Sequence, residues 1–122
     1  MINCIMVGIG GFIGSVCRYL IGLLPVEAGS GFPIKTLAIN VVGAFCLGLI
    51  AALAAKHEGV DPHVVLLLKV GVCGGFTTFS TFAYESTELM RSGHAPAAFA
   101  YICVSVLLGV AAIFASQLLV KG

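Results

Sequence analysis

The stretch from Gly74 to Phe82 reads Gly-Gly-Phe-Thr-Thr-Phe-Ser-Thr-Phe, and its backbone and side chains could bind a small ion. Paired glycines and four hydroxyl residues interrupt a run that is otherwise apolar. A regular helix is not expected to persist there. Interrupted backbone inside a membrane is tolerated only where protein or an aqueous cavity satisfies the freed N–H and C=O groups. We interpret the stretch as an ion or substrate site; the alternative is a simple kink at the glycine pair.

The sign of the ion is left open by the interruption alone. Freed carbonyls can coordinate a hard cation, whereas a helix N-terminus and hydroxyl donors favour an anion. Phe79 and Phe82 are three residues apart and would share a helix face, and the positive edge of a phenyl ring attracts anions. Such a pair is also typical of plain packing. It becomes informative only beside polar partners.

Three polar side chains in other apolar segments could be such partners. Asn40 lies near the middle of one segment, where an unpaired amide is costly, and its NH₂ group can donate to an anion. Tyr101 and Ser105 are four residues apart and could form a hydroxyl track on one helix face. For each of the three, a hydrogen bond between helices is an equally good explanation.

Three ionisable residues lie deep enough in apolar sequence to need a role. Arg18 and Lys69 could raise the local concentration of anions at a pore mouth or extend to lipid headgroups, and the second role is favoured for Lys69. Glu85 is unfavourable in an anion path unless it is protonated, paired with a cation or placed at a vestibule. Arg18 and Glu85 are therefore the candidates for a role inside the membrane.

The elements that must position these residues are four apolar helices. Hydrophobic residues make up 60% of the 122 positions and charged residues 9%, well below the ~25% of a soluble domain. Turn-forming stretches lie near 25–34, 57–63 and 91–96. The predicted spans are about 3–24, 35–56, 64–90 and 96–120, each close to the ~20 residues that cross a bilayer. We predict an all-α membrane protein with one domain over residues 1–122 and a broken third helix.

Several classes of protein and of site are excluded by what the sequence lacks. A nucleophile elbow, a metal-ligand cluster and a nucleotide-binding fingerprint are all absent, so an enzyme is not expected, and no segment resembles a nucleic-acid-binding module. The five cysteines form no C-x-x-C pair and are interpreted as small membrane residues. The first span has no basic leader or cleavage site, so we expect it to be retained.

Glycine spacing and charge distribution predict how the helices associate. Gly10-x-x-x-Gly14 and Gly71-x-x-x-Gly75 are small-residue faces that allow close helix packing. The basic residues divide evenly between the two membrane faces, which gives the insertion machinery no preferred orientation. Those on the side of the termini are Lys56, Lys69 and Lys121, and those opposite are Arg18, Lys35 and Arg91. We therefore expect dual topology and antiparallel pairing.

Three motifs together resemble the Fluc (CrcB) family of fluoride channels. They are Gly10 to Gly14 followed by Arg18-Tyr19, Thr36 to Gly43, and Gly74 to Phe82. The resemblance covers all four spans. It implies an antiparallel homodimer in the lipid of the cell inner membrane, with two pores that let fluoride leave the cell and so give fluoride resistance.

The resemblance also implies roles for individual residues. Phe79 and Phe82 would offer ring edges to fluoride, Asn40 an amide, Ser80 and Thr81 hydroxyls, and Tyr101 and Ser105 the start of a polar track. Arg18 and Glu85 would lie near a pore end. The backbone carbonyls of Gly74 and Thr77 would bind a structural sodium ion at the dimer axis. The track departs from the family at Gly109, where the hydroxyl ladder stops.

A passive channel is sufficient for this function. Hydrogen fluoride crosses membranes, dissociates in the cytoplasm and traps fluoride there, so an anion leak exports it without ATP. Selection over chloride requires a narrow path whose donors replace the hydration shell. Two alternatives are a small multidrug exporter, which would need an acid in the first span where this chain has Arg18, and a noncatalytic assembly subunit, which would leave the broken helix without purpose.

Overall fold

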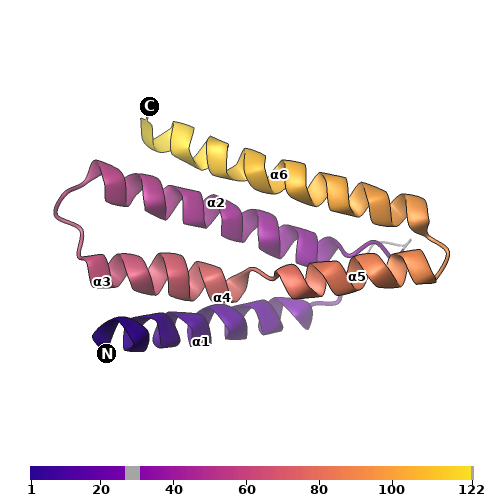
Figure 1. Cartoon of the computed structure of the whole chain (residues 1–122), viewed down its shortest axis with the longest axis horizontal. Coiled ribbons are helices and arrows are strands. Elements are labelled where there is room, and N and C mark those ends of the chain that lie inside the picture. Colours follow the sequence, from indigo (N-terminus) through magenta and orange to yellow (C-terminus); the bar gives the residue numbers. More distant parts are fainter. Residues whose placement is uncertain (27–30, 122) are drawn as a thin grey trace.

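The computed structural model describes residues 1–26 and 31–121, and these residues form an all-helical protein (Figure 1). Part of the predicted turn at 25–34 therefore lies outside the described residues. The helices are α1 (Ile2–Gly22), α2 (Ile34–Lys56), α3 (Pro62–Val65), η1 (Leu66–Cys73), α4 (Gly74–Phe76), α5 (Phe79–Arg91) and α6 (Ala95–Lys121).

Four helical stretches are long and apolar enough to cross a membrane. They are Ile2–Gly22, Ile34–Lys56, Pro62–Arg91 and Ala95–Lys121. Each end lies within two residues of the predicted span, so the prediction of four apolar helices is confirmed. The two termini lie at the same end of the bundle (Figure 1), as an even number of spans requires.

The helices pack in two main pairs. In Figure 1, α1 runs along the segment formed by α3, η1 and α4, while α2 lies between that segment and α6. The closest packing joins α1 to η1 and α4, and joins α2 to α6. The second half of the third stretch, α5, contacts α6. The first two helices, α1 and α2, share few contacts although they are consecutive in sequence.

Glycines bring α1 against the third stretch, and the predicted small-residue faces are confirmed. A methyl group added to Gly10 would lie 2.7 Å from the Cα atom of Gly71. One added to Gly75 would lie 2.7 Å from the carbonyl oxygen of Gly11, and one added to Gly14 would lie 2.2 Å from a carbonyl oxygen of η1. These backbones pack so closely that only glycine fits at each position.

The third stretch changes conformation along its length. Its middle part, η1, is a π-helix, and the α-helical turn of α4 follows and ends at Phe76. Thr77 and Thr78 then have extended backbone, with ψ angles of 157° and 119°, before α5 begins. Gly43 of α2 accommodates this segment, because a methyl group there would lie 2.2 Å from Cγ2 of Thr77.

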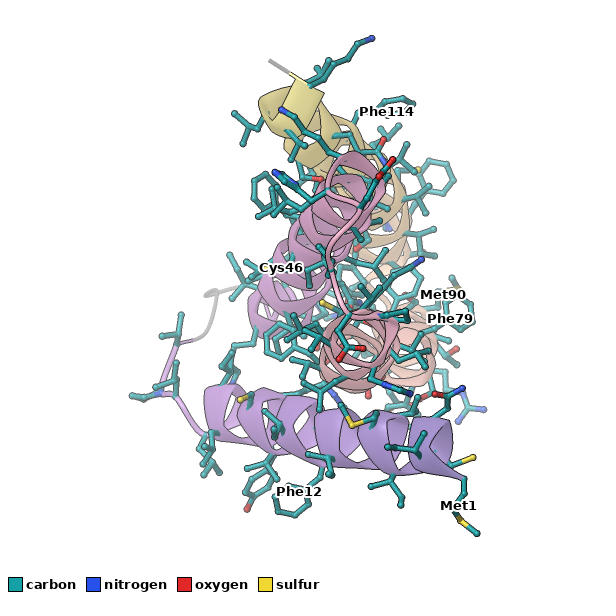
Figure 2. All side chains as sticks on the ribbon, turned by 90° about the vertical axis from the view of Figure 1, so that its left-hand side faces the viewer. Met1, Phe12, Cys46, Phe79, Met90 and Phe114 are labelled. Atoms are coloured by element: carbon teal, nitrogen blue, oxygen red, sulfur yellow. The ribbon has the colours of Figure 1, made fainter. Side chains whose placement is uncertain are left out.

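Most large apolar side chains point away from the bundle. Figure 2 shows Phe12 of α1 and Phe114 of α6 projecting outward, and they are 70% and 64% exposed. The buried core is small by comparison and is centred on Leu89, Ala98 and Tyr101. An apolar exterior around a few buried polar groups is the arrangement expected of a protein in lipid.

Candidate functional site

Asn40 of α2 holds the extended segment of the third stretch with two hydrogen bonds. Its Nδ2 donates to the carbonyl oxygen of Thr78 at 3.0 Å, and the amide nitrogen of Thr78 donates to its Oδ1 at 2.8 Å. The side chain therefore takes the place of a neighbouring backbone and satisfies both polar groups that the interruption frees at Thr78. One hydrogen of the Asn40 NH₂ group remains available as a donor.

Two further carbonyl groups just before the interruption have donors. The carbonyl oxygen of Cys73 accepts from the amide nitrogen of Thr77 at 3.1 Å and from its Oγ1 at 3.0 Å. The carbonyl oxygen of Gly75 accepts from Nε of Arg18, on α1, at 3.2 Å. The interruption is thus held by side chains from α1 and α2.

The carbonyl groups of Gly74, Phe76 and Thr77 have no hydrogen-bond donor within residues 1–26 and 31–121. Gly74 is exposed on the surface of the chain, and Thr77 is half-buried. Free carbonyl oxygens are the ligands that hard cations such as sodium take in proteins. The oxygens of Gly74 and Thr77 therefore fit the cation implied at these two positions.

A cluster of hydroxyl groups follows at the start of α5. The amide nitrogen of Thr81 donates to Oγ1 of Thr78 at 3.2 Å, which makes Thr78 the N-cap of the helix. Oγ1 of Thr78 also lies 3.1 Å from Oγ1 of Thr81 and 3.5 Å from Oγ of Ser80. Thr78 was not singled out among the four hydroxyl residues. The N-cap pattern that it forms with Thr81 is the signal that could have identified it.

The aromatic side chains form a row from the surface to the core. The ring centroids of Phe79 and Phe82 are 5.8 Å apart, and those of Phe82 and Tyr101 are 5.1 Å apart. Phe32, which the sequence did not indicate, meets Tyr101 edge-on at 5.4 Å. Phe79 is 78% exposed and projects outward (Figure 2), whereas Tyr101 is fully buried.

Glu85 connects three helices. Its Oε2 accepts from Oγ1 of Thr36 at 3.0 Å, and its Oε1 accepts from the hydroxyl of Tyr101 at 3.0 Å. The carboxyl group of α5 is thereby bonded to α2 and α6. In the described part of the chain it has hydroxyl partners and no ion pair. Thr36 was not a predicted site residue, because its partner is distant in the chain.

Ser105 lies one turn beyond Tyr101 on α6. Its Oγ is buried and has no hydrogen-bond partner among the described residues. Tyr101 and Ser105 therefore follow one another along α6, while only Tyr101 is joined to the polar groups of α5.

A cleft of about 770 Å³ lies beside these groups, between the last turns of α1, the first turns of α2, and α5. Its lining includes Arg18, Thr36, Thr78, Thr81 and Glu85. Lys35 also lines it, and its Nζ donates to the carbonyl oxygens of Gly22 and Leu24 at the end of α1.

The structure thus gathers most of the predicted site residues in one region. Asn40, Gly74 and Thr77 lie at the interruption, and Arg18, Thr81 and Glu85 line the cleft. Phe82 packs on Tyr101, whose hydroxyl donates to Glu85. Phe79 and Ser80 are exposed on the outside of the chain. The arrangement offers hydroxyl and amide hydrogens and ring edges to an anion, and free carbonyl oxygens to a cation.

Comparison with known proteins gives a consistent result over the whole chain. The family model described as CrcB-like protein, Camphor Resistance (CrcB), matches residues 5–117. A protein of Chlorobaculum tepidum named fluoride-specific ion channel FluC is 47% identical over 121 residues, which cover 99% of this chain and 96% of the relative. A protein of the same name from Agrobacterium fabrum is 43% identical, over 94% of this chain and 93% of its own length. Another from Rhizobium etli is 42% identical, over 99% of this chain and 98% of its own length.

Proposed function

Because the chain belongs to the CrcB family, we propose that it is a fluoride-selective ion channel of the cell inner membrane. As a member of this family of multi-pass membrane proteins it is an ion channel and not an enzyme. The observation that carries the proposal is the full-length similarity to relatives named fluoride-specific ion channels. The donors and ring edges around Thr78 support it from the geometry of the chain itself.

The proposed pathway begins in the cleft and follows polar hydrogens along the broken third membrane span. The hydroxyl groups at the start of α5 and the free amide hydrogen of Asn40 replace water around the anion. The edges of Phe82 and Phe79 carry it past the middle of the membrane, and Tyr101 and Ser105 extend the polar track on α6. Chloride is larger and less strongly solvated by such donors, so a narrow path of this kind selects fluoride.

The functional unit that we propose is an antiparallel homodimer with two pores. Gly74, Phe79 and Ser80 are exposed on the single chain although they belong to the site, and a second copy would cover them. A serine hydroxyl that faces hydrocarbon has no partner there, whereas one that faces a pore has water or the ion. The balance of three basic residues on each membrane face favours insertion in both orientations.

We also propose a structural sodium ion at the axis of this dimer. The free carbonyl oxygens of Gly74 and Thr77 from two copies would hold it. When bound, the ion supplies a positive charge that offsets the repulsion between carbonyl dipoles brought close together. The residues of this chain contribute by keeping these two oxygens free while Asn40 and Arg18 bind their neighbours.

Transport by such a channel is passive, and its direction follows from acid chemistry. Fluoride accumulates in a near-neutral cytoplasm when hydrogen fluoride enters and dissociates, so an anion-selective leak releases it down its electrochemical gradient. Cells that carry the channel would thereby resist fluoride.

The first experiment reconstitutes the purified protein in liposomes loaded with fluoride or chloride and records release with ion-selective electrodes. We expect rapid release of fluoride, little release of chloride, and loss of fluoride release in Phe82→Ile. Phe114→Ile makes the same substitution on an outward-facing part of α6 and is expected to conduct normally. Folded wild-type protein that releases neither anion would contradict the proposed function.

The assembly is tested separately. Half of the copies carrying a C-terminal epitope tag should lose it when sealed inverted membrane vesicles are treated with protease, and light scattering should give a dimer. Complete loss or complete protection of the tag would refute dual topology. Exchange of sodium for N-methylglucamine should abolish fluoride release, and unchanged release would refute the sodium site.

A further inference from the structure

The side chain of Arg18 makes a hydrogen bond that attraction of anions does not require. Its Nε donates to the carbonyl oxygen of Gly75 at 3.2 Å, across the interface between α1 and the third membrane span. The same side chain lines the cleft and is half-buried. A cation that only attracted fluoride would have no need of a carbonyl partner, because attraction at a distance depends on charge alone.

Gly75 needs a donor because of the interruption. In a continuous helix its carbonyl oxygen would accept from the amide nitrogen four residues later, at Phe79. The extended backbone of Thr77 and Thr78 separates Phe79 from α4 and removes that donor. A carbonyl group without a partner is costly in a membrane, so the group must be satisfied from another helix.

The position of α1 fixes the point from which Arg18 can reach this carbonyl group. Gly14 lies one turn earlier on α1, and a methyl group there would lie 2.2 Å from the carbonyl oxygen of Val72 and 2.8 Å from the amide nitrogen of Phe76. The two backbones are therefore in contact just before the interruption. Arg18 follows one turn later on the same helix, where its side chain meets the carbonyl group of Gly75.

We propose that Arg18 is a positioning residue for the pore: by binding Gly75 it fixes the end of α4 from the α1 side, as Asn40 fixes Thr78 from the α2 side. This division leaves the carbonyl groups of Gly74, Phe76 and Thr77 without donors among the described residues. The proposal rests on the proposed function, since it assigns the residue a part in conduction. Arg18 then supports conduction by holding the backbone of the third span, and not by adding charge to the cleft.

The two roles of a cation respond differently to salt. Attraction of anions by an accessible charge weakens as the screening length falls from ~10 Å at about 0.1 M salt to ~3 Å at about 1 M. A hydrogen bond that holds the backbone does not depend on screening in this way. Arg91 provides a matched control, because it is an exposed cation in the last turn of α5, at the same end of the bundle, and makes no hydrogen bond within the described residues.

Fluoride release is measured for the wild type, Arg18→Met, Arg18→Lys and Arg91→Met in an impermeant salt at both concentrations. We expect Arg18→Met to slow release at least about tenfold, by the same factor at low and high salt, because it loses a charge-assisted hydrogen bond. Arg91→Met should conduct like the wild type. A loss in Arg18→Met that disappears at high salt, or a loss of equal size in Arg91→Met, would overturn the proposal.

A spectroscopic readout tests the hydrogen bond directly. With carbonyl-labelled glycine and nitrogen-labelled phenylalanine, only the Gly-Phe pairs at 11–12, 31–32 and 75–76 give signals in a carbonyl–amide correlation spectrum. The carbonyl signal of Gly75 should move to lower frequency in Arg18→Met while the other two stay in place. In Arg18→Lys the release rate should follow this signal. If Arg18→Lys releases fluoride at the wild-type rate while its Gly75 signal stays at the position seen in Arg18→Met, charge alone matters and the positioning role is refuted.

The outcomes separate the two proposals. Wild-type protein that releases no fluoride refutes the proposed function, and the Gly75 signal then still shows whether Arg18 binds this carbonyl group. Wild-type protein that conducts, together with an Arg18→Met variant of normal rate and unmoved signal, refutes the positioning role alone. If Arg18→Met does not yield folded protein, Arg18→Gln is measured in its place. Its amide can still donate, so its release rate should follow the Gly75 signal, and a normal rate with a moved signal would refute the positioning role.

Discussion

Substitution of Gly14 by alanine should separate α1 from the third membrane span. The added methyl group would lie 2.2 Å from the carbonyl oxygen of Val72, whereas real contacts of this kind are essentially never under 3.0 Å. The partner is rigid helical backbone and not the end of a flexible side chain. The two helices must therefore move apart by about 0.8 Å at this point.

Two effects contribute to the loss of folding stability in Gly14→Ala. Overpacking of a tight contact costs about 1–3 kcal/mol. The same displacement would lengthen the bond from Arg18 to Gly75, now 3.2 Å, beyond the range of a hydrogen bond, and loss of a charge-assisted bond costs about 1.5–3 kcal/mol. We expect a destabilisation of about 2.5–6 kcal/mol from the two effects together.

Unfolding by sodium dodecyl sulfate in mixed micelles, followed by far-ultraviolet circular dichroism, measures this change, since the chain has no tryptophan. Gly8→Ala is the matched control, because Gly8 lies on the same helix and a methyl group there has nothing within 4 Å. Alanine is favoured over glycine in a helix by up to about 1 kcal/mol, so this variant should be as stable as the wild type or slightly more stable.

Gly14→Ala that unfolds at the same detergent fraction as Gly8→Ala would refute this reasoning. It would mean that the interface of α1 opens without cost. The close approach of the two backbones would then contribute nothing to stability, and the position of Arg18 would have to be fixed by something else.

Two further substitutions test other contacts of the site. Asn40→Leu removes both hydrogen bonds to Thr78 and leaves the amide and carbonyl groups of Thr78 without partners. Fluoride release should therefore fall at least about a hundredfold. A rate within threefold of the wild type would show that the two hydrogen bonds from Asn40 are not needed for conduction. Tyr101→Phe keeps the ring but removes a hydroxyl donor from Glu85, so the free energy of unfolding should fall by about 1.5–3 kcal/mol. Tyr84→Phe is the control, because Tyr84 is 66% exposed, and it should leave stability unchanged. Equal effects of the two substitutions would argue against the hydrogen bond between Tyr101 and Glu85.

The membrane spans could be predicted from the sequence because they depend on one property, a sufficient length of apolar residues between turns. Their ends were found to within two residues. The glycine spacing at 10, 14, 71 and 75 predicted the close contact between α1 and the third stretch for a similarly local reason, because small residues four apart form a continuous face on one helix.

The contacts between helices could not be predicted in the same way. Asn40 was recognised as a polar residue in apolar sequence, but its pairing with both backbone groups of Thr78 depends on how α2 lies against the interruption. Thr36 and Glu85 are 49 residues apart, and no local pattern relates them. Because α2 and α6 are apolar on all sides, hydrophobic periodicity does not indicate which face meets which neighbour.

The π-helical η1 was also not predicted from the sequence. Its composition, Leu-Leu-Leu-Lys-Val-Gly-Val-Cys, suits an ordinary α-helix. The wider turn occurs where the third span packs on the glycines of α1, and the short α4 separates it from the interruption. The conformation is therefore a property of the packed protein and not of the segment alone.

The pairing of alternate helices has a consequence for how the chain matures during synthesis. The first span packs mainly on the third, and the second span packs mainly on the fourth. The first two spans therefore cannot reach their final packing by contact with each other. Each must wait in lipid as a single helix while later residues are made, a delay on the order of seconds at about 5–20 residues per second. A ribosome that stalls before Gly74 would leave α1 with its glycine face open to any other helix, and such products should be substrates for membrane quality control.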